Sequence, residues 1–309
     1  MKEICTRILF LVIIAAIGMG AINSPTALIL GFVFTLVCDN PYKYYIHKTI
    51  HFSLKVSVVG LGFGMLINET LETSKAGFRL TFYAIGLTIA LGLFLTRLFR
   101  LDLKLGHLIT SGTAICGGSA IAAISPVIKA KSKTISIALG AVFFLNAIAL
   151  FVFPFVGHLF HLTQEQFGLW CAIAIHDTSS VVGAALGYGE QALKIATAVK
   201  LSRTLWIIPL SLFSMVLFKT KEEKIKIPYF ILLFIVAILL NSYHVLPETI
   251  TSFLVLMAKR LLIVTLFLVG SSILIKDLKT TGMKPFLLAL ILWLFISIFS
   301  LLYILSSTK

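Results

Sequence analysis

The sequence predicts an all-α integral membrane protein that crosses the bilayer many times. Its 309 residues are 59% hydrophobic and only 12% charged, and the mean hydropathy is +1.05. A soluble domain carries about 25% charged residues. The apolar residues also gather in blocks of about 18–25 residues, the length of helix that crosses about 30 Å of hydrocarbon. The short alternating strands that build a membrane β-barrel are not seen in the sequence.

Eleven apolar blocks follow one another along the chain. The first comes after Lys2 and Arg7, and a second block follows it at once. We therefore expect a retained first span with a cytoplasmic N-terminus rather than a cleaved signal peptide. The blocks lie at about 8–22, 27–38, 52–67, 79–97, 105–128, 134–157, 166–188, 192–218, 228–241, 250–275 and 284–305.

The net charge of +14, from 26 Lys and Arg against 12 Asp and Glu, is concentrated between the blocks. Short basic clusters between apolar segments are typical of cytoplasmic loops in membrane proteins. This pattern explains the positive charge without nucleic acid, so we expect no nucleic-acid partner.

Charge also bears on the topology. Eleven complete spans would place the basic loop 129–133 outside the cell, against the positive-inside rule. The conflict disappears if blocks 105–128 and 166–188 enter the membrane and return, which leaves nine spans. The alternative is two complete but broken spans, so the prediction is a helical bundle of about 9–11 spans with two interrupted or re-entrant helices.

Two internal repeats favour a transporter architecture. At an offset of 61, residues 119–123 align with 180–184, and the alignment continues into the following spans. At an offset near 206, residues 40–77 resemble residues 246–282. In the hairpin topology both offsets relate segments of opposite orientation, and inverted repeats around broken helices are a recurring design of secondary transporters.

The two breaks are the candidate binding site. Irregular backbone at membrane depth survives only when protein buries it or when it lines a wet cavity. Glycines allow close backbone approach, Ser119 is a suitable N-cap, and facing helix N-termini attract anions. The predicted anion-binding residues are Cys116, Gly117, Gly118, Ser119, Thr178, Ser179 and Ser180.

Asp177 is the carboxylate expected at membrane depth, where an ionisable group is a functional hypothesis by default. It could carry a coupling proton or Na⁺, or it could only cap a helix. His176, beside it, could titrate near neutral pH. We expect both residues to act in ion coupling.

Lys200 and Arg203 lie one helical turn apart in the span after the second break. Arg203 could clamp an oxyanion with paired donors; the alternatives are a salt bridge to Asp177 or snorkelling to the interface. Lys200 and Asn146 are further candidates, and Asn146 could form a hydrogen bond between helices.

Other function classes lack their motifs. The sequence has no nucleophile elbow, P-loop or dinucleotide fingerprint and no metal-ligand spacing of His and Cys. The four cysteines show no paired spacing. We expect no enzyme activity, no cofactor and no metal.

Three segments resemble a known family. They are 113–123 (TAICGGSAIAA), 174–184 (AIHDTSSVVGA) and 196–209 (ATAVKLSRTLWIIP). They are similar to the YeiH-type family of bacterial membrane proteins, described as sulfate exporters, and the resemblance covers essentially the whole chain. It implies a bacterial inner-membrane location, a two-part fold with a moving core, and membership of the cation:proton antiporter and anion transporter superfamily.

These inferences divide the chain into N-terminal spans (1–104), a transport core with both hairpins (105–218) and C-terminal spans (219–309). The expected function is secondary active export of a small anion such as sulfate, coupled to protons or Na⁺. A cation/proton antiporter that uses Asp177 and an anion channel are the alternatives. The expected partners are the lipid bilayer and the anion, and a homodimer stays open.

Overall fold

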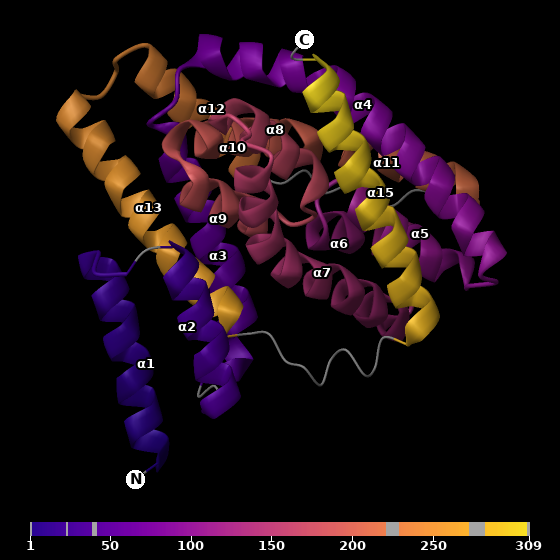
Figure 1. The fold of residues 1–309 in the computed structure, drawn as a ribbon, viewed down its shortest axis with the longest axis horizontal. Helices are drawn as coiled ribbons and strands as arrows, with labels where there is room; N and C mark the ends of the chain where they lie inside the picture. Colours follow the sequence, from indigo (N-terminus) through magenta and orange to yellow (C-terminus); the bar gives the residue numbers. More distant parts are fainter. Residues whose placement is uncertain (1, 23, 39–41, 221–228, 272–281, 308–309) are drawn as a thin grey trace. The chain divides into compact units, whose positions relative to one another are not determined.

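The computed structural model describes residues 2–22, 24–38, 42–220, 229–271 and 282–307, and this part of the chain is helical with no strand (Figure 1). A helix falls on each of the eleven predicted apolar blocks. The described helices are α1 (Lys2–Met19), α2 (Ser24–Val37), α3 (Lys43–Gly62), α4 (Ile67–Leu98), α5 (Leu103–Ala114), α6 (Gly118–Val127), α7 (Ser132–Leu159), α8 (Gln164–Ala174), α9 (Thr178–Tyr188), α10 (Glu190–Thr204), α11 (Ile207–Phe218), α12 (Tyr229–Ser242), α13 (Glu248–Gly270) and α15 (Met283–Ser307).

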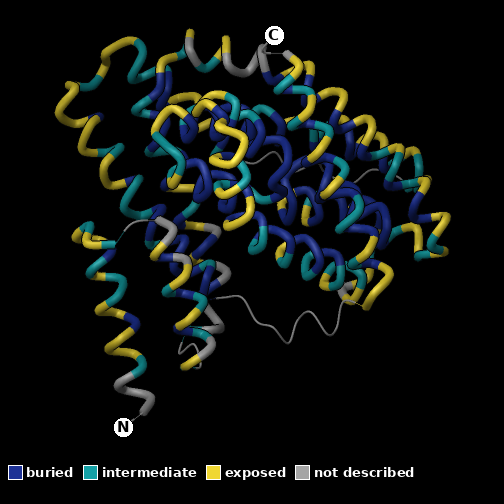
Figure 2. The backbone as a smooth tube through the Cα atoms, viewed as in Figure 1, coloured by how far each residue is buried: buried dark blue, intermediate teal, exposed yellow. Residues whose placement is uncertain are grey.

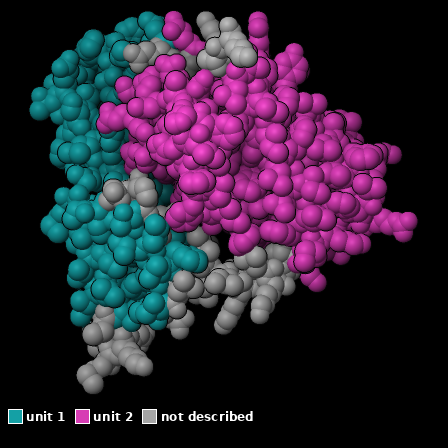
Figure 3. Space-filling view, in the orientation of Figure 1, with its two compact units in different colours: residues 1–71, 228–274 teal, residues 72–227, 275–309 magenta. Residues whose placement is uncertain are grey.

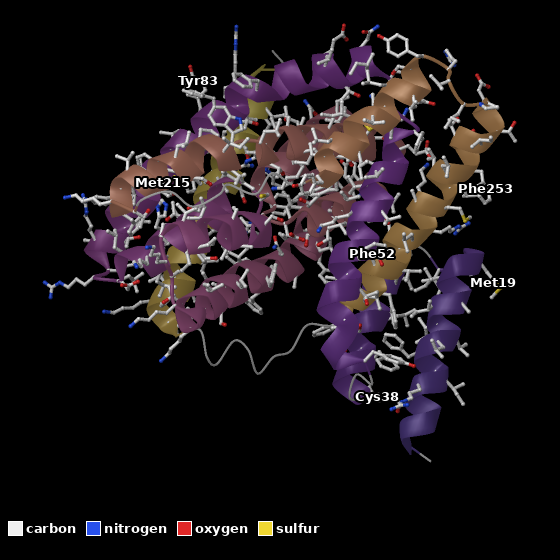
Figure 4. All side chains as sticks on the ribbon, turned by 180° about the vertical axis from the view of Figure 1, so that it is seen from behind. Met19, Cys38, Phe52, Tyr83, Met215 and Phe253 are labelled. Atoms are coloured by element: carbon white, nitrogen blue, oxygen red, sulfur yellow. The ribbon has the colours of Figure 1, made fainter. Side chains whose placement is uncertain are left out.

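The predicted fold class, a multi-pass helical membrane protein, is confirmed. Among the described residues, five segments are long and apolar enough to cross a membrane: Thr70–Leu98, Lys133–Leu159, Glu190–Phe218, Glu248–Gly270 and Met283–Ser306. Large apolar side chains such as Phe52, Tyr83 and Phe253 lie exposed on the outer surface (Figure 4). Such exposure suits lipid and would be costly in water.

The chain divides into two compact units, which are coloured separately in Figure 3. Unit 1 comprises residues 1–71 and 228–274, and unit 2 comprises residues 72–227 and 275–309. Unit 2 extends beyond the predicted core 105–218 because α4 and α15 pack against the hairpins that the core contains. The division into a moving core and flanking spans stays a prediction.

Unit 1 contains the long-range repeat. Shifting α2 and α3 by 206 residues places them on α12 and α13 to within about two residues. The helix contacts follow the same symmetry, since α2 packs on α13, α12 packs on α3, and α3 packs on α13.

Two hydrogen bonds are related by this repeat. The Thr35 hydroxyl donates to the Ser271 carbonyl at 2.7 Å, and the Asn241 amide donates to the Met65 carbonyl at 3.1 Å. Adding 206 to 35 gives 241, and adding 206 to 65 gives 271. A symmetric pair of polar contacts is much stronger evidence for a repeat than the matching of apolar letters.

The two halves of the long-range repeat run in opposite directions. A Cβ built at Gly60 would meet Ala258, and a Cβ built at Gly64 would meet Val255, so the partner's residue number falls as the position in α3 rises. The helices α3 and α13 are therefore antiparallel, as an inverted repeat requires.

Unit 2 contains two helical hairpins. In hairpin 1, which consists of α5 and α6, the Lys104 ammonium donates to the Lys129 carbonyl at 3.1 Å. The start of α5 therefore lies beside the end of α6, and the segment returns to the side from which it came. This geometry confirms the predicted hairpin in block 105–128, and its re-entry into the membrane stays a prediction.

Hairpin 2, which consists of α8 and α9, closes in the same way. The Tyr188 hydroxyl donates to the Leu162 carbonyl at 2.7 Å, and the Gln164 side chain accepts from the Gln191 amide at 3.0 Å. The end of α9 therefore lies beside the start of α8, which confirms that block 166–188 also forms a hairpin.

The short-range repeat relates these elements. Shifting α5, α6 and α7 by 61 residues brings each start to within about three residues of the start of α8, α9 and α10. The hairpins are joined by α7, whose 28 residues make a helix about 42 Å long. Hairpin 1 precedes α7 and hairpin 2 follows it, so the two hairpins enter from opposite ends of that helix.

A glycine substitution tests the packing in unit 1. We expect Gly31→Ala to destabilise the protein by about 1–3 kcal/mol through overpacking, because its Cβ would meet the Phe267 carbonyl and lie 2.9 Å from the Ser271 amide nitrogen. The measurement is the melting temperature in detergent. The control is Gly18→Ala, where a Cβ would meet nothing within 4 Å; equal melting temperatures for both variants would refute this packing.

Candidate functional site

The tips of the two hairpins meet. Tip 1 comprises residues 115–117 and tip 2 comprises residues 175–177, each joining the two helices of its hairpin. Gly117 adopts φ +61°, and a Cβ there would lie 3.3–3.4 Å from backbone atoms of His176 and Asp177. A side chain at this position would be strained and would separate the tips, so glycine lets the two chains approach closely.

The contact lies at the middle of α7. The Asp177 amide donates to Asn146 Oδ1 at 3.1 Å, and Asn146 stands near the midpoint of α7. Since α7 is long enough to cross the membrane, the tips meet near half depth. The structure therefore brings the candidate Asn146 to the predicted site.

Asp177 caps the second half-helix of hairpin 2. Its carboxylate accepts from the Ser179 amide at 3.0 Å and from the Ser179 hydroxyl, and it is partly exposed. Thr178, Ser179 and Ser180 follow it in the first turn of α9 and are buried. One negative charge therefore stands at the positive end of this helix.

The second half-helix of hairpin 1 starts differently. Its N-cap is Gly117, which has no side chain to cap the helix. The expectation that Ser119 is the N-cap is wrong, because α6 begins before it, and Ser119 is exposed. The first amides of α6 thus have no side-chain cap, and such a helix start is suited to bind an anion.

Lys200 contacts the backbone of both tips. It is fully buried, and its ammonium group donates to the carbonyls of Ile115 at 3.1 Å, Ala172 at 3.3 Å and Ile175 at 2.7 Å. An ammonium group has three hydrogens and could donate to all three carbonyls at once. Lys200 thus binds carbonyls from both hairpins at once.

Arg203 makes a parallel set of contacts and is also fully buried. Its Nε and Nη2 atoms donate to the Ala114 carbonyl at 3.0 and 2.5 Å. Its Nη1 atom donates to the carbonyls of Ala172, at 3.3 Å, and Ile173. These carbonyls belong to the last turns of α5 and α8, where the helix leaves them without partners.

The two cations therefore neutralise the C-terminal ends of the first half-helices. Every partner of Lys200 and Arg203 in the described part of the chain is a backbone carbonyl. Full burial excludes snorkelling, and no bond links either residue to Asp177 there. Direct contact of Arg203 with an anion stays a prediction, and in this conformation its donors face the carbonyls.

Several polar atoms near the tips have no partner within the described residues. They are both ring nitrogens of His176, the Asn146 Nδ2 atom and the Thr113 hydroxyl. The His176 ring lies beside the Val142 backbone without reaching hydrogen-bond geometry. Unsatisfied buried groups are uncommon in folded proteins, and these atoms are free to bind a polar ligand.

The remaining candidates lie on the same elements. Cys116 and Gly118 are buried beside Gly117, and Figure 2 shows both hairpins to be largely buried. Their roles in binding stay predictions. The described residues contain no group of three His, Cys, Asp or Glu side chains that could hold a metal ion.

His107 was missed by the sequence analysis. It lies on α5, is fully buried, and its Nε2 atom lies 2.8 Å from the Ser214 hydroxyl of α11. The available signal was a run of polar residues in a re-entrant segment, with His107 and Ser111 four positions apart on one helical face.

Comparison with known proteins gives the relatives of the chain. A family model described as conserved hypothetical protein 698 matches residues 6–289. A UPF0324 membrane protein of Photobacterium profundum is 49% identical over 96% of this chain and 91% of its own. One from Bacteroides thetaiotaomicron is 46% identical over 92% and 86%, and one from Geobacter sulfurreducens is 40% identical over 94% of each chain. No solved structure matches.

Removing the ammonium group of Lys200 tests its role. We expect Lys200→Met to lower the stability by about 1–3 kcal/mol for each buried carbonyl left without a donor, since Ile115, Ala172 and Ile175 lose a shared donor. The melting temperature in detergent is the measurement. Lys194→Met, in the same helix but only half-buried, is the control, and a Lys200 variant as stable as this control would contradict the assignment.

Proposed function

The chain belongs to the conserved hypothetical protein 698 family of membrane proteins, and from that premise we propose that it is a secondary active transporter of a small anion such as sulfate. The architecture supports transport in general. Two hairpins enter from opposite ends of α7 and meet near its middle, and repeats of opposite direction surround a site at half depth in many secondary transporters.

The charge balance at the tips favours an anion, and this is the observation that carries the proposal. Lys200 and Arg203 contribute two positive charges, and Asp177 contributes one negative charge. Two helix N-termini and two helix C-termini, with about half a charge each, cancel. A net charge of about +1 remains at membrane depth, where an unpaired charge costs about 2.5–3.5 kcal/mol or more, and a bound anion would neutralise it.

The anion would bind at the uncapped start of α6. The amides of Gly118 and Ser119, together with the Ser119 hydroxyl, provide donors, and the start of α9 adds Thr178 and Ser180. Lys200 and Arg203 act from behind the tips through their charge, because carbonyls occupy their donors. Binding therefore depends on backbone amides, as at other helix N-termini.

Asp177 would link anion binding to protonation. Its carboxylate caps α9 next to Gly117, so it repels an anion at the start of α6. Protonation removes this repulsion, and the proton and the anion therefore favour each other's binding. In this proposal Asp177 and His176 provide the coupling, and the anion and proton occupy the site together.

The topology completes the proposal. The basic segments around Arg97, Lys104 and Lys131 face the cytoplasm, in accord with the positive-inside rule. The N-terminus then lies in the cytoplasm, and the protein resides in the bacterial inner membrane.

A cation/proton antiporter is the second candidate. It is favoured by the partial exposure of Asp177, while Lys200 and Arg203 are completely buried. In that case the carboxylate itself binds the transported cation, and the amides of α6 take no part.

Anion binding can be measured on purified protein. We expect sulfate to raise the melting temperature by mass action, with about 1.4 kcal/mol of stabilisation at ten times its dissociation constant. Potassium gluconate at equal ionic strength is the control. If neither sulfate nor any other oxyanion tested shifts the melting temperature at pH 5 or pH 8, the anion proposal fails.

The variant Asp177→Asn separates the two candidates. For an anion carrier it should strengthen stabilisation by sulfate, because the carboxylate that repels the anion is absent. A variant that loses a response to Na⁺ or Li⁺, while sulfate has no effect on either protein, would support the cation antiporter instead.

A further inference from the structure

A row of buried polar side chains runs along α5 and α11, away from the hairpin tips. It consists of His107 and Ser111 on α5 and of Ser211 and Ser214 on α11, and all four are at most 1% exposed. The row lies within unit 2 and includes none of the residues assigned above to anion binding.

Two contacts fix the direction of the row. At one end Arg203, just before α11, binds the Ala114 carbonyl at the end of α5. At the other end His107 binds Ser214. From the first contact to the second, the residue number rises from 203 to 214 along α10 and α11 and falls from 114 to 107 along α5. The two segments are therefore antiparallel. By their positions along the two helices, Ser111 and Ser211 fall between these contacts, so the row leads from tip 1 toward the start of hairpin 1.

The hydrogen bonds of Ser214 determine the tautomer of His107. The Ser214 hydroxyl has one hydrogen, which it donates to the Leu210 carbonyl at 2.7 Å. The 2.8 Å contact therefore requires His107 Nε2 to be the donor. In the neutral ring Nδ1 is then an acceptor, and it has no partner in the described part of the chain. The nearest rings, Phe213 and Phe218, provide no polar atom to it.

Three atoms of the row lack partners in this way: His107 Nδ1 and the hydroxyls of Ser111 and Ser211. Each unsatisfied buried group costs about 1–3 kcal/mol, and three such atoms within about two helical turns would be a large penalty. Buried water with two to four polar partners removes a penalty of this kind.

We propose that this row lines a chain of water molecules that carries protons between the basic start of hairpin 1 and the tips, with His107 as the relay. A protonated water passes its proton to Nδ1: one O–H bond breaks, one N–H bond forms, and the ring becomes an imidazolium. A second water, on the side of Ser111, then replaces the first at Nδ1 and accepts the proton: the N–H bond breaks, an O–H bond forms, and the ring is neutral again. The coupling role of this path rests on the proposed anion transport, whereas the water chain itself does not.

Charged groups stand at the ends of the row. Asp102 and Lys104 lie at the start of α5, Lys219 follows α11, and Arg203 lies at the tips. The sequence of α6 contains no charged residue. On the other helices packed against α5, the charged residues toward the basic end are Arg97 of α4, Lys133 of α7 and Lys284 of α15.

Hydroxyl-radical footprinting of the purified protein tests the water chain directly. Radicals formed from internal water oxidise adjacent side chains, so His107 should be labelled in the folded protein at a substantial fraction of its rate in denatured protein. Phe167, which is fully buried between aromatic rings, is the dry control and should be protected at least tenfold more. Equal protection of the two residues overturns the proposal.

Proton movement tests the relay. In liposomes with an internal pH dye and a sulfate gradient, we expect His107→Gln to slow proton flux at least tenfold and to leave stabilisation by sulfate unchanged. Thr88→Val, which removes another buried and unpartnered hydroxyl, on α4, should have wild-type flux. Wild-type flux in His107→Gln overturns the relay.

Two further outcomes keep the proposals separable. If His107→Gln does not fold, Ser111→Ala replaces it, and undiminished flux in that variant counts against the path. If wild-type protein shows no response to sulfate but His107 is labelled, the anion proposal fails and the water chain stands.

Discussion

The fold depends on one constraint: two helices stop in the middle of the membrane, and the carbonyls at their ends need partners where there is no bulk water. Lys200 and Arg203 provide those partners. Between them they bind carbonyls of residues 114 and 115 in hairpin 1 and residues 172, 173 and 175 in hairpin 2. The C-terminal ends of both half-helices are thus held by one helix, α10. Because each cation binds both hairpins, neither hairpin can withdraw without exposing unpaired carbonyls or an unpaired charge.

Inverted symmetry explains how one chain builds such a site. Hairpin 1 and hairpin 2 are related by 61 residues, and α7 occupies in the first repeat the place of α10 and α11 in the second. The polar partners do not follow the repeat, however. From α7 comes Asn146, which accepts from the tip 2 backbone, whereas from α10 come two cations. The half-helix starts differ too, with Gly117 at one and Asp177 at the other. Symmetry places the four helix ends together, and the differences between repeats determine their charge.

Much of this arrangement could be predicted from the sequence, for identifiable reasons. Apolar blocks and their polar interruptions are properties of the chain alone, and the basic loop 129–133 favoured the hairpin interpretation that the structure confirms. The use of Lys200 and Arg203 could not be predicted, because their partners are main-chain carbonyls, which every residue possesses. The N-cap of α6 was misjudged because serine is the better cap by residue type, while the geometry at Gly117 requires a positive φ. His107 was overlooked because its partner Ser214 is 107 residues away.

The charges at the tips fall into two kinds. Lys200 and Arg203 are fully buried, and backbone carbonyls occupy their donors. Asp177 is partly exposed, and Ser179 is the residue that binds its carboxylate among the described residues. A carrier must bind and release its substrate, so it needs one charge that can change and a framework that stays the same. In the proposed mechanism the buried Lys200 and Arg203 form the framework, and the accessible carboxylate of Asp177 is the charge that changes. A proton path through His107 would bring the proton to this carboxylate.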